Sequence, residues 1–469
     1  MPATWGDITA EEILAPTNGA LVSGKQQSVF SGISTDSRST GPGELFWALV
    51  GERFDGHDFA QTALDRGAAG VVAQKDRALR ISRPNDPTVI EVDDSLKAFG
   101  DLAGWWRHQH DARVVAITGS AGKTTTKEMV AGILAMGRPT LVTQGNFNNL
   151  IGLPITLLRL EKGHRNAVLE MGMNRSGEIA RLTEIADPDV GVITNVGMAH
   201  LEGLGDIKGV ARAKVELVER ISPGGRVILN GDDKLLMETA AVYRKNALTF
   251  GFGEHNDIRG TKLRNLGQEG SFFYLRYEGS SLAVKLNVPG IQNVFNALAA
   301  AAVCLCLRAP PEHIAEGLHG FTGVKGRFTL VNLGDVTLVD DTYNANPSSL
   351  KAAVESVGAL VDKGGRIIVG LGEMMELGDA ATTAHREAGR MVAALEVKRF
   401  LAMGEHAREM VEGALESGMH RDKAATVKTH DEMVEIIGAE MQQGDLIFLK
   451  GSRKMDLGKV VDGLRNRCR

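Results

Sequence analysis

The chain has 469 residues, of which 43% are hydrophobic and 24% charged, and it carries a net charge of −5. This composition is typical of a globular protein with several hydrophobic cores and roughly three domains. The negative net charge and the aromatic content of only 5% argue against a nucleic acid or an anionic membrane surface as partner. No apolar run reaches the ~18 residues that a membrane span requires.

The N-terminal segment, residues 1–15, has no basic stretch followed by an apolar core, so we expect no secretory signal. Cys304 and Cys306 lie in an alanine- and leucine-rich run that predicts a buried helix, which favours core packing over metal binding. The third cysteine, Cys468, stands alone, and no disulfide framework is evident. We therefore expect a cytoplasmic protein, and we expect it to be a monomer.

Residues 1–112 are predicted to form a small α/β domain. Short strand candidates lie at 33–38, 44–50, 70–74 and 88–92, and a helix is expected over 96–110.

Residues 113–326 predict a central mononucleotide-binding domain built on a parallel sheet. Apolar runs at 114–118, 167–173, 190–196 and 226–232 alternate with helical patterns, which is typical of parallel strands with crossover helices. A β-rich insertion at 272–288 precedes an apolar helix at 293–307.

Residues 327–469 repeat this alternation on a smaller scale. Strand candidates at 336–344, 366–374, 399–405 and 446–453 predict a Rossmann-like, doubly wound domain. The predicted fold class is therefore α/β with three domains, at 1–112, 113–326 and 327–469.

A glycine-rich segment follows the first apolar run of the central domain. Between this strand and a helical segment the chain reads Thr118-Gly-Ser-Ala-Gly-Lys-Thr124. Such a loop turns backbone N–H groups toward phosphates, the lysine reaches the β and γ phosphates, and the threonine hydroxyl can bind Mg²⁺. The alternative is a plain strand-to-helix turn with an exposed lysine. The spacing favours nucleotide binding by Gly119, Ser120, Ala121, Gly122, Lys123, Thr124 and Thr125.

Two further residues follow predicted strands, where parallel sheets bind ligands. Glu170 ends one strand, and a carboxylate there suits Mg²⁺ on ATP phosphates. His200 follows another strand. The alternatives are a solvated charge at Glu170 and a structural histidine at His200.

Lys214 falls inside the apolar stripe of a predicted helix at 206–221. A buried ammonium is costly unless it is paired or loses its charge. Three interpretations stay open: a side chain that reaches out to solvent, a partner anion, or conversion by CO₂ to a carbamate that helps to bind Mg²⁺.

The segments that lead into the C-terminal domain carry weaker signals. Asn293 and Asn296 open a predicted helix, where asparagine is a common cap. Asp341 ends a predicted strand, where a carboxylate can bind ribose hydroxyls. The Asn346-Pro347 step suits the start of a helix.

Taken in order, these segments resemble the Mur ligases over nearly the full length of the chain. The matching motifs are TGSAGKTTTKEM, GNFNNLIGLP, LEMGMNRSGEI, TNVGMAHLEGLG, ARAKVEL, PGIQNVFNALAAA, KGRF and DDTYNANPSSL. The N-terminal run ISTDSRSTGPGELFWALVGERFDGHDFA is similar to the UDP-binding segment of that family.

The resemblance implies a role for each motif residue. Lys123, His200 and Lys214 are implied to be catalytic. Mg²⁺ is implied to bind to Thr124, Glu170, His200 and carbamylated Lys214. The phosphate loop with Asn293, Asn296, Arg327 and Asp341 is implied to bind ATP. The implied precursor-binding and substrate-binding residues are Ser34, Asp36, Ser37, Arg38, Asn148, Asn149, Asn344 and Asn346.

The implied activity is ATP-dependent amide-bond formation in cell-wall synthesis. The motifs are most similar to the branch that adds D-alanyl-D-alanine to UDP-N-acetylmuramoyl-tripeptide. The carboxylate of the precursor attacks the γ-phosphate of ATP, and the incoming amine then displaces phosphate from the acyl phosphate. Such chemistry depends on positioning and on charge neutralisation.

Three alternatives remain. The sister ligase that adds a diamino acid characteristically carries an Asp-Asn-Pro-Arg loop, which this sequence lacks. A folylpolyglutamate synthetase would share the phosphate loop but not the N-terminal UDP-binding segment. A non-catalytic, nucleotide-gated scaffold would be expected to have lost some of Lys123, Glu170, His200 and Lys214, all of which are present.

Overall fold

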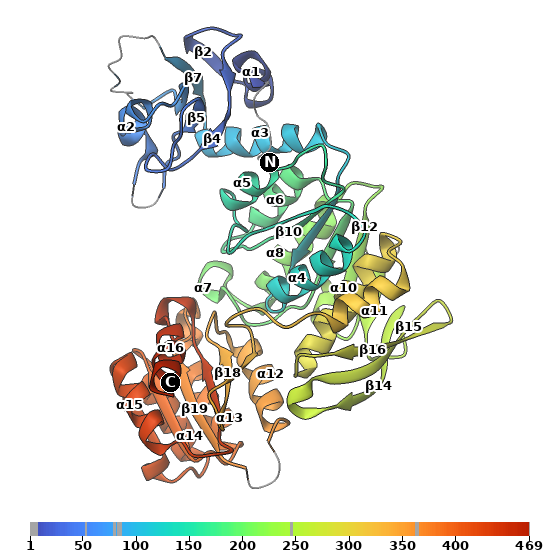
Figure 1. Cartoon of the computed structure of the whole chain (residues 1–469), viewed down its shortest axis with the longest axis vertical. Coiled ribbons are helices and arrows are strands. Elements are labelled where there is room, and N and C mark those ends of the chain that lie inside the picture. Colours follow the sequence, from blue (N-terminus) through green and yellow to red (C-terminus); the bar gives the residue numbers. More distant parts are fainter. Residues whose placement is uncertain are drawn as a thin grey trace. The chain divides into compact units, whose positions relative to one another are not determined.

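The computed structural model describes residues 8–51, 54–77, 81, 87–243, 247–361 and 365–468, and its ribbon is drawn in Figure 1. The chain divides into two compact units. Unit 1 consists of Met1–Val114, Pro139–Leu169 and Arg181–Pro188, and unit 2 of Val115–Arg138, Glu170–Ala180 and Asp189–Arg469. Helices alternate with strands along the chain, as predicted for the α/β class. The boundaries after residues 112 and 326 stay a prediction.

The N-terminal sheet in unit 1 has five strands in the order β2-β7-β6-β5-β4. The strands are β2 (Ala20–Ser23), β4 (Gly32–Ser34), β5 (Glu44–Trp47), β6 (Gly70–Gln74) and β7 (Thr88–Val92). All neighbours are parallel except β2, which the sequence analysis missed. Of the candidate at 33–38, only the first two residues belong to a strand, and the rest form the turn that follows it.

Side-chain caps mark the start of three of the four helical segments in this region, and α2 has none. The four segments are α1 (Ala10–Thr17), η2 (Gly56–Phe59), α2 (Ala60–Asp65) and α3 (Ser95–His108). A separate pair of short strands, β1 (Ile8–Thr9) and β3 (Val29–Phe30), lies beside them in the sequence. Thr9 and Glu12 form a capping box at the start of α1. The side chain of Asp94 caps α3, which matches the helix predicted over 96–110.

The central sheet has nine strands in the order β16-β15-β14-β13-β12-β11-β8-β10-β9. They are β8 (Arg113–Thr118), β9 (Thr140–Val142), β10 (Asn166–Glu170), β11 (Val190–Ile193), β12 (Arg226–Asn230), β13 (Ala247–Gly251), β14 (Ile258–Asn265), β15 (Ser271–Tyr277) and β16 (Ser280–Leu286). Residues 114–118 of β8 are all buried, as expected for a parallel strand covered on both faces.

The β-rich insertion continues this sheet. Strands β14, β15 and β16 are antiparallel to one another, and β14 runs parallel to β13. The sequence analysis predicted the last two strands and missed β14. The apolar helix predicted after them is α10 (Ile291–Cys306), in which Cys304 is fully buried.

Shorter helices connect the central strands. They are α4 (Lys123–Ala135), α5 (Gly152–Leu157), α6 (Glu178–Ala186), α7 (Leu201–Leu204), α8 (Ile207–Arg220), α9 (Lys234–Thr239), α11 (Pro311–His319) and η4 (Gly267–Glu269). Helices α4, α10 and α11 pack against one another in unit 2.

The C-terminal sheet has six strands in the order β17-β18-β22-β19-β20-β21. The strands are β17 (Thr329–Asn332), β18 (Thr337–Asp341), β19 (Ile367–Gly372), β20 (Arg399–Met403), β21 (Ala424–Val427) and β22 (Leu446–Lys450). The four predicted strands are confirmed, and β17 is an additional antiparallel edge strand.

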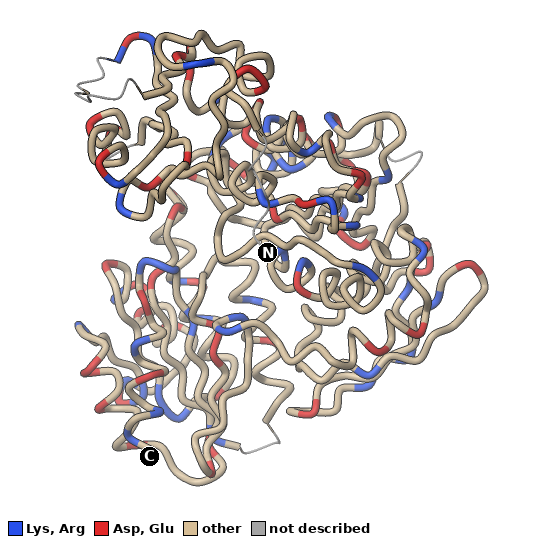
Figure 2. Tube along the Cα trace, turned by 45° about the horizontal axis from the view of Figure 1, so that its top comes forward, with Lys and Arg blue, Asp and Glu red and all other residues tan. Residues whose placement is uncertain are grey.

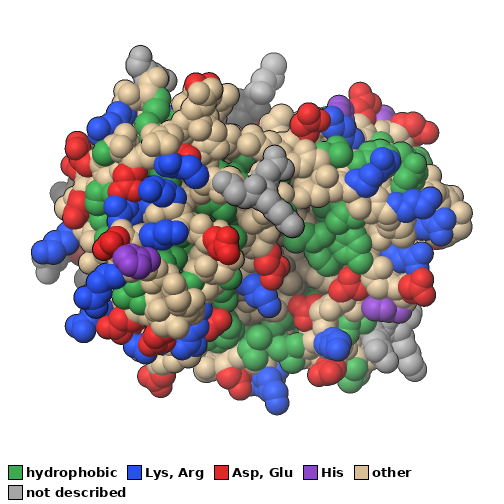
Figure 3. All heavy atoms as spheres, turned by 90° about the horizontal axis from the view of Figure 1, so that it is seen from below, with side chains coloured by type: hydrophobic (Ala, Val, Ile, Leu, Met, Phe, Trp, Pro, Cys, Tyr) green, Lys and Arg blue, Asp and Glu red, His purple; other side chains and the backbone are tan. Residues whose placement is uncertain are grey.

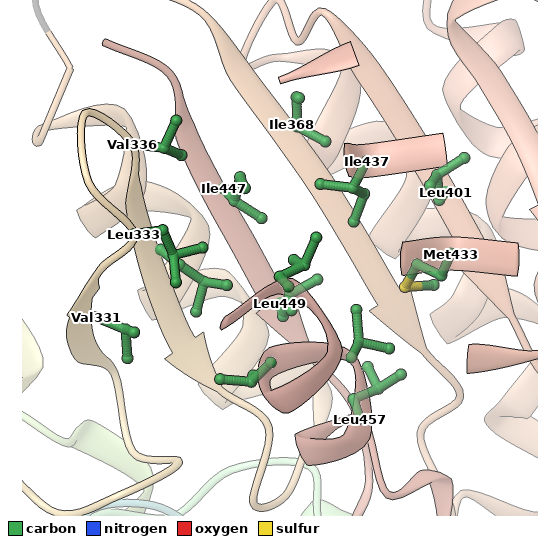
Figure 4. Close-up of a cluster of buried hydrophobic side chains, with 14 of the residues drawn as sticks. Val331, Leu333, Val336, Ile368, Leu401, Met433, Ile437, Ile447, Leu449 and Leu457 are labelled. Atoms are coloured by element: carbon green, nitrogen blue, oxygen red, sulfur yellow. The ribbon is translucent and has the colours of Figure 1, made fainter. Parts of the chain in front are cut away.

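Helices cover this sheet in two groups. The first group packs side by side and consists of α12 (Pro347–Gly358), α13 (Ala381–Ala393) and α14 (Ala407–Glu416). In the second, α15 (His430–Glu440) packs against α16 (Gly458–Arg467). Short turns η5 (Gly378–Ala380), η6 (Arg421–Lys423) and η7 (Arg453–Met455) complete it. One core lies under α15 and α16 (Figure 4), where strands and helices contribute Ile368, Leu401, Ile447, Leu449, Met433, Ile437 and Leu457.

Acidic and basic residues are interspersed along the chain trace (Figure 2). The face drawn in Figure 3 carries side chains of both signs around apolar patches. Within the described ranges, no helix is both long enough and apolar enough to cross a membrane.

Helices α13 and α14 approach closely because glycines face each other. A Cβ atom on Gly389 would lie 1.8 Å from the carbonyl oxygen of Met410, and one on Gly413 would lie 1.9 Å from that of Arg386. We predict that Gly389→Ala lowers the stability of the chain by about 1–3 kcal/mol, because the helices must move apart. Differential scanning calorimetry of the full chain measures this as a lower Tm.

The matched control is Gly132→Ala in helix α4, where an added Cβ meets no atom within 4 Å. This change should leave Tm unchanged or raise it, because alanine is favoured over glycine in a helix by about 0.5–1 kcal/mol. A Gly389→Ala variant as stable as Gly132→Ala would contradict the close-approach explanation.

Candidate functional site

The predicted phosphate loop is a turn, Gly119–Gly122, between β8 and α4. Gly119 has φ +153° and Gly122 has φ +81°, which side-chain-bearing residues rarely adopt. A Cβ at the first position would lie 1.9 Å from Oγ1 of Thr194, and one at the second 2.2 Å from Oδ1 of Asn296. Both glycines are therefore required by backbone shape and by space.

The turn after strand β11 braces the phosphate loop. Asn195 accepts a hydrogen bond from the Ala121 amide through Oδ1 (2.9 Å), and its Nδ2 donates to the Ala121 carbonyl (3.0 Å). Thr194 donates to the same carbonyl (2.6 Å), and Ser120 Oγ accepts from the amide of Gly197 (2.8 Å). The sequence analysis missed Thr194 and Asn195, which lie inside the strand predicted at 190–196 but in the structure follow β11 (Val190–Ile193), the kind of position that had singled out His200.

Four predicted site residues meet at the start of helix α4. The Thr124 hydroxyl donates to Oε2 of Glu170 (2.8 Å), and Nη2 of Arg327 donates to that hydroxyl (3.2 Å). The Lys123 ammonium donates to the Gly119 carbonyl (2.8 Å). Thr125, in the same helical turn, is buried. The cluster joins the phosphate loop to the start of the C-terminal segment.

Lys214 interacts electrostatically with Lys123 of this cluster. Its side chain, on helix α8, is only 1% exposed, so it does not reach out to solvent. Burial holds the pKa of Lys214 well below its usual value, and the neighbouring Lys123 lowers it further. Burial also lowers the pKa of Lys123, against the attraction of Glu170. No hydrogen-bond or ion-pair partner of Lys214 is found in the described part of the chain.

His200 caps helix α7 with a left-handed backbone, φ 55°. Its Nδ1 lies 2.5 Å from Oε2 of Glu376, which the sequence analysis did not single out. Among the described residues, no group of three or more histidine, cysteine, aspartate or glutamate side chains is placed to hold a metal. The predicted magnesium set contains two such side chains, Glu170 and His200, of which only Glu170 is anionic, so a second anionic ligand there depends on carbamylation of Lys214.

The two asparagines of helix α10 do not cap it, because the cap is Gly290. The cap interpretation of Asn293 and Asn296 was therefore wrong. Asn293 donates to the carbonyl of Pro289 (2.7 Å), and Nδ2 of Asn296 donates to Oδ1 of Asn293 (3.3 Å). Asn296 also accepts a bond from Thr126 of helix α4 (3.4 Å) and so supports the phosphate loop from behind.

Asp341 ends strand β18 in a buried ion pair. Lys450, at the end of neighbouring strand β22, donates to its Oδ2 (2.6 Å), and the Phe328 amide donates to its Oδ1 (3.1 Å). Burial raises the pKa of Asp341, while Lys450 and Arg327 act in the opposite direction. The sequence analysis missed Lys450, although its position at the end of a strand could have singled it out as a candidate site residue.

The guanidinium of Arg327 lies over the ring of Tyr343, 4.0 Å from the ring centre. Asn344, the next residue, is exposed. Asn346 caps helix α12 by accepting from the Ser349 amide (2.8 Å), which confirms the predicted helix start. Its Nδ2 donates to the Ser120 carbonyl of the phosphate loop (3.2 Å).

In unit 1 the predicted UDP-binding loop is preorganised. Asp36 accepts from Nε and Nη2 of Arg38 (2.9 and 2.7 Å), and this bond lowers the pKa of Asp36 to about 2. The Arg38 side chain is 88% exposed and remains accessible. Ser34 and Ser37 are buried beneath the turn, and Thr40 donates to the Ser34 hydroxyl (3.1 Å).

The predicted precursor-binding asparagines also lie in unit 1. Asn149 accepts from the amides of Ile151 (3.2 Å) and Gly152 (2.8 Å) and holds the start of helix α5. Asn148 is half-buried beside it.

Three family models match successive parts of the chain. Residues 29–105 match the Mur ligase family, catalytic domain, residues 117–304 the Mur ligase middle domain, and residues 326–453 the Mur ligase, glutamate ligase domain.

Curated relatives align over almost the whole chain. A UDP-N-acetylmuramoyl-tripeptide–D-alanyl-D-alanine ligase of Bacillus subtilis is 35% identical, covering 97% of this chain and 98% of the relative. Its counterpart in Escherichia coli is 39% identical, covering 92% and 93%.

Solved structures agree with this alignment. A MurF from Acinetobacter baumannii superposes with a TM-score of 0.88 at 32% identity and 99% coverage of both chains. MurF ligase from Thermotoga maritima, solved in complex with ADP, has a TM-score of 0.82 at 28% identity, covering 93% of this chain and 97% of that one. The three-domain α/β architecture is thereby confirmed, and the chain belongs to the Mur ligase family.

Proposed function

We propose that the chain joins D-alanyl-D-alanine to UDP-N-acetylmuramoyl-tripeptide at the expense of ATP, as a cytoplasmic monomer in peptidoglycan synthesis. The observation that carries this proposal is the cluster of Lys123, Thr124, Glu170, Lys214 and Arg327 on a braced phosphate loop. The curated relatives that align over nearly their whole length carry this activity in their names. Residues 1–112 bind the UDP precursor, 113–326 bind ATP, and 327–469 bind the incoming dipeptide.

The chemistry follows from charge and position. An oxygen of the precursor carboxylate attacks the γ-phosphorus, and the bond to the β-phosphate oxygen breaks to release ADP. Lys123 and Arg327 neutralise the charge that spreads over the transferred phosphoryl group. The dipeptide amine then attacks the acyl carbon, phosphate leaves, and the amine loses a proton.

Mg²⁺ fits the donors that the site presents. The buried carboxylate of Glu170 and the hydroxyl of Thr124 are oxygen ligands of the kind that Mg²⁺ prefers. We assign Thr124, Glu170, His200 and carbamylated Lys214 to the ion, which when bound would supply positive charge that neutralises phosphate oxygens. Asn293, Asn296 and Asp341 bind the nucleoside, Ser34, Asp36, Ser37, Arg38, Asn148 and Asn149 the precursor, and Asn344 and Asn346 the dipeptide.

Carbamylation of Lys214 requires a neutral amine, and burial supplies it. A lysine whose pKa is depressed has a larger neutral fraction at a given pH than an exposed lysine, so less proton loss is needed before the amine attacks CO₂. The product is an N-carboxylate and one proton. It places an anion beside Lys123.

We predict that Lys214→Ala loses at least about a hundredfold in kcat and that short carboxylic acids such as acetate partly restore activity. The measurement is the rate of ADP release with both substrates present. In the wild-type chain, ¹³CO₂ should give a ¹³C carbamate resonance that is absent from Lys214→Ala.

The matched control is Lys208→Ala, which removes an exposed lysine from the same helix α8. It should keep wild-type activity and the resonance. A wild-type spectrum without the resonance in fully active enzyme would count against the carbamate.

For the N-terminal domain we predict that Arg38→Ala raises the KM for UDP-tripeptide about tenfold or more and leaves the KM for ATP unchanged. The reason is loss of a charge-assisted bond to the diphosphate, worth about 1.5–3 kcal/mol. Arg66→Ala, an exposed arginine of the same unit, is the control and should change neither constant. Equal effects of Arg38→Ala on both constants would refute the assignment.

The choice of incoming substrate is tested by product mass. Incubation with UDP-tripeptide, ATP, Mg²⁺ and D-alanyl-D-alanine should yield UDP-pentapeptide, and Lys123→Ala should yield none. The loop at Asn344 and Asn346 has no arginine that could bind a second carboxylate on the incoming amino acid. This favours a dipeptide with uncharged side chains. Addition of lysine or diaminopimelate to a UDP-dipeptide instead would establish the sister activity.

A further inference from the structure

Glu376 has been given no role so far, although it touches a proposed site residue. It follows strand β19 and the Gly372–Met375 turn, in the C-terminal part of unit 2. Its Oε2 lies 2.5 Å from Nδ1 of His200, and its backbone carbonyl accepts a hydrogen bond from the Glu202 amide (3.2 Å). The C-terminal segment thus contacts the turn that carries His200 through both a side chain and the main chain.

The contact decides which nitrogen of His200 is available. An ionised carboxylate presents only lone pairs, so the nitrogen that faces it at this distance carries the hydrogen, although the two atoms do not form a hydrogen bond of good geometry. With the hydrogen on Nδ1, Nε2 of the neutral ring keeps a lone pair for a metal or a donor.

Both residues adopt a left-handed backbone conformation, which is unfavourable for residues other than glycine. His200 has φ 55° and Glu376 has φ 63°. Their neighbours must therefore hold them in place, and the geometry of the pair is set by the fold around it.

The turn that presents Glu376 is rigidly held from within the C-terminal sheet. The Met374 amide donates to Nε2 of His385 (2.9 Å), and the Met375 amide donates to Oγ of Ser452 (2.8 Å). His385 is fully buried, and its other nitrogen bonds the carbonyl of Ala381 (2.7 Å). Two consecutive amides are thus fixed immediately before Glu376.

We propose that Glu376 is a positioning residue: by contacting Nδ1 it fixes the tautomer and orientation of His200, so that this ligand is in place only when the C-terminal segment engages the His200 turn. The inference rests on the proposed role of His200 in the Mg²⁺–phosphate site. Completion of that site then depends on a residue that lies 176 positions further along the chain than His200.

The kinetic test compares Glu376→Ala, Glu376→Gln and the wild-type full chain. Glu376→Ala should lower kcat by about tenfold to a hundredfold, as expected for a partner of a metal-binding histidine, and leave the KM for UDP-tripeptide unchanged. Glu376→Gln should fall between the two, because its amide oxygen can still face Nδ1 while the negative charge is lost. Asp379→Asn, an exposed acid of the neighbouring turn η5, is the control and should behave as wild type.

A double-mutant cycle separates positioning from a general structural effect. In a His200→Ala background, Glu376→Ala should cause no further loss, because its effect passes through the imidazole. Equal losses in both backgrounds would overturn the proposal, as would wild-type kinetics of Glu376→Ala.

The second readout is nucleotide affinity without turnover. Isothermal titration calorimetry with a non-hydrolysable ATP analogue should show affinity weakened about tenfold by Glu376→Ala with Mg²⁺ present and unchanged in EDTA. Equal weakening in both conditions would indicate loss of structure and overturn the inference. Absence of UDP-pentapeptide from wild-type reactions would instead refute the proposed function.

Discussion

The site is organised around buried positive charge that exceeds its negative charge. Lys123 and Arg327 lie near one buried carboxylate, Glu170, and Lys214 lies near Lys123. Burying an ammonium is expensive, and burial lowers the pKa of both lysines accordingly. A polyanionic ligand such as a nucleoside triphosphate relieves this excess. The fold therefore holds the charges where phosphate would need them.

A comparison of two buried lysines shows how the chain uses this constraint. Lys450 also lies at a strand end, but its ammonium is neutralised by Asp341 at 2.6 Å, so it serves the packing of strands β18 and β22. Lys214 has a cation, Lys123, as the neighbour that shifts its pKa. Lys450 is therefore paired within the protein, whereas no anionic partner of Lys214 is found among the described residues.

The phosphate loop depends on residues that lie far away along the chain. Asn195, Asn296 and Asn346 come from three different elements and contact Ala121, Gly122 and Ser120. Each contact uses an amide or a backbone group, whose short range demands accurate placement. This explains why the loop keeps its shape although its own residues are small.

The sequence by itself determined the α/β class, the phosphate loop and the strand-end positions of Glu170 and Asp341. These follow from local causes: period-two and helical apolar patterns, and glycines that alone tolerate positive φ. It also singled out Lys214, since a charge inside an apolar stripe is visible without a structure. Eight strands of the described residues were missed: β1, β2, β3, β9, β13, β14, β17 and β21. Six of them have only two residues or lie at the edge of a sheet, where the apolar pattern is short or weak.

Only the tertiary structure decided the partners. In the structure Asn293 bonds Pro289, and Asn296 supports the phosphate loop instead of capping a helix. Asp341 pairs with Lys450, and Glu376 contacts His200. These pairs are separated by up to 176 residues, and no local pattern encodes which distant side chain will neutralise a charge or accept a proton. That choice is made when sheets and helices pack, because hydrogen bonds and ion pairs between distant residues form only after the elements that carry them are in register.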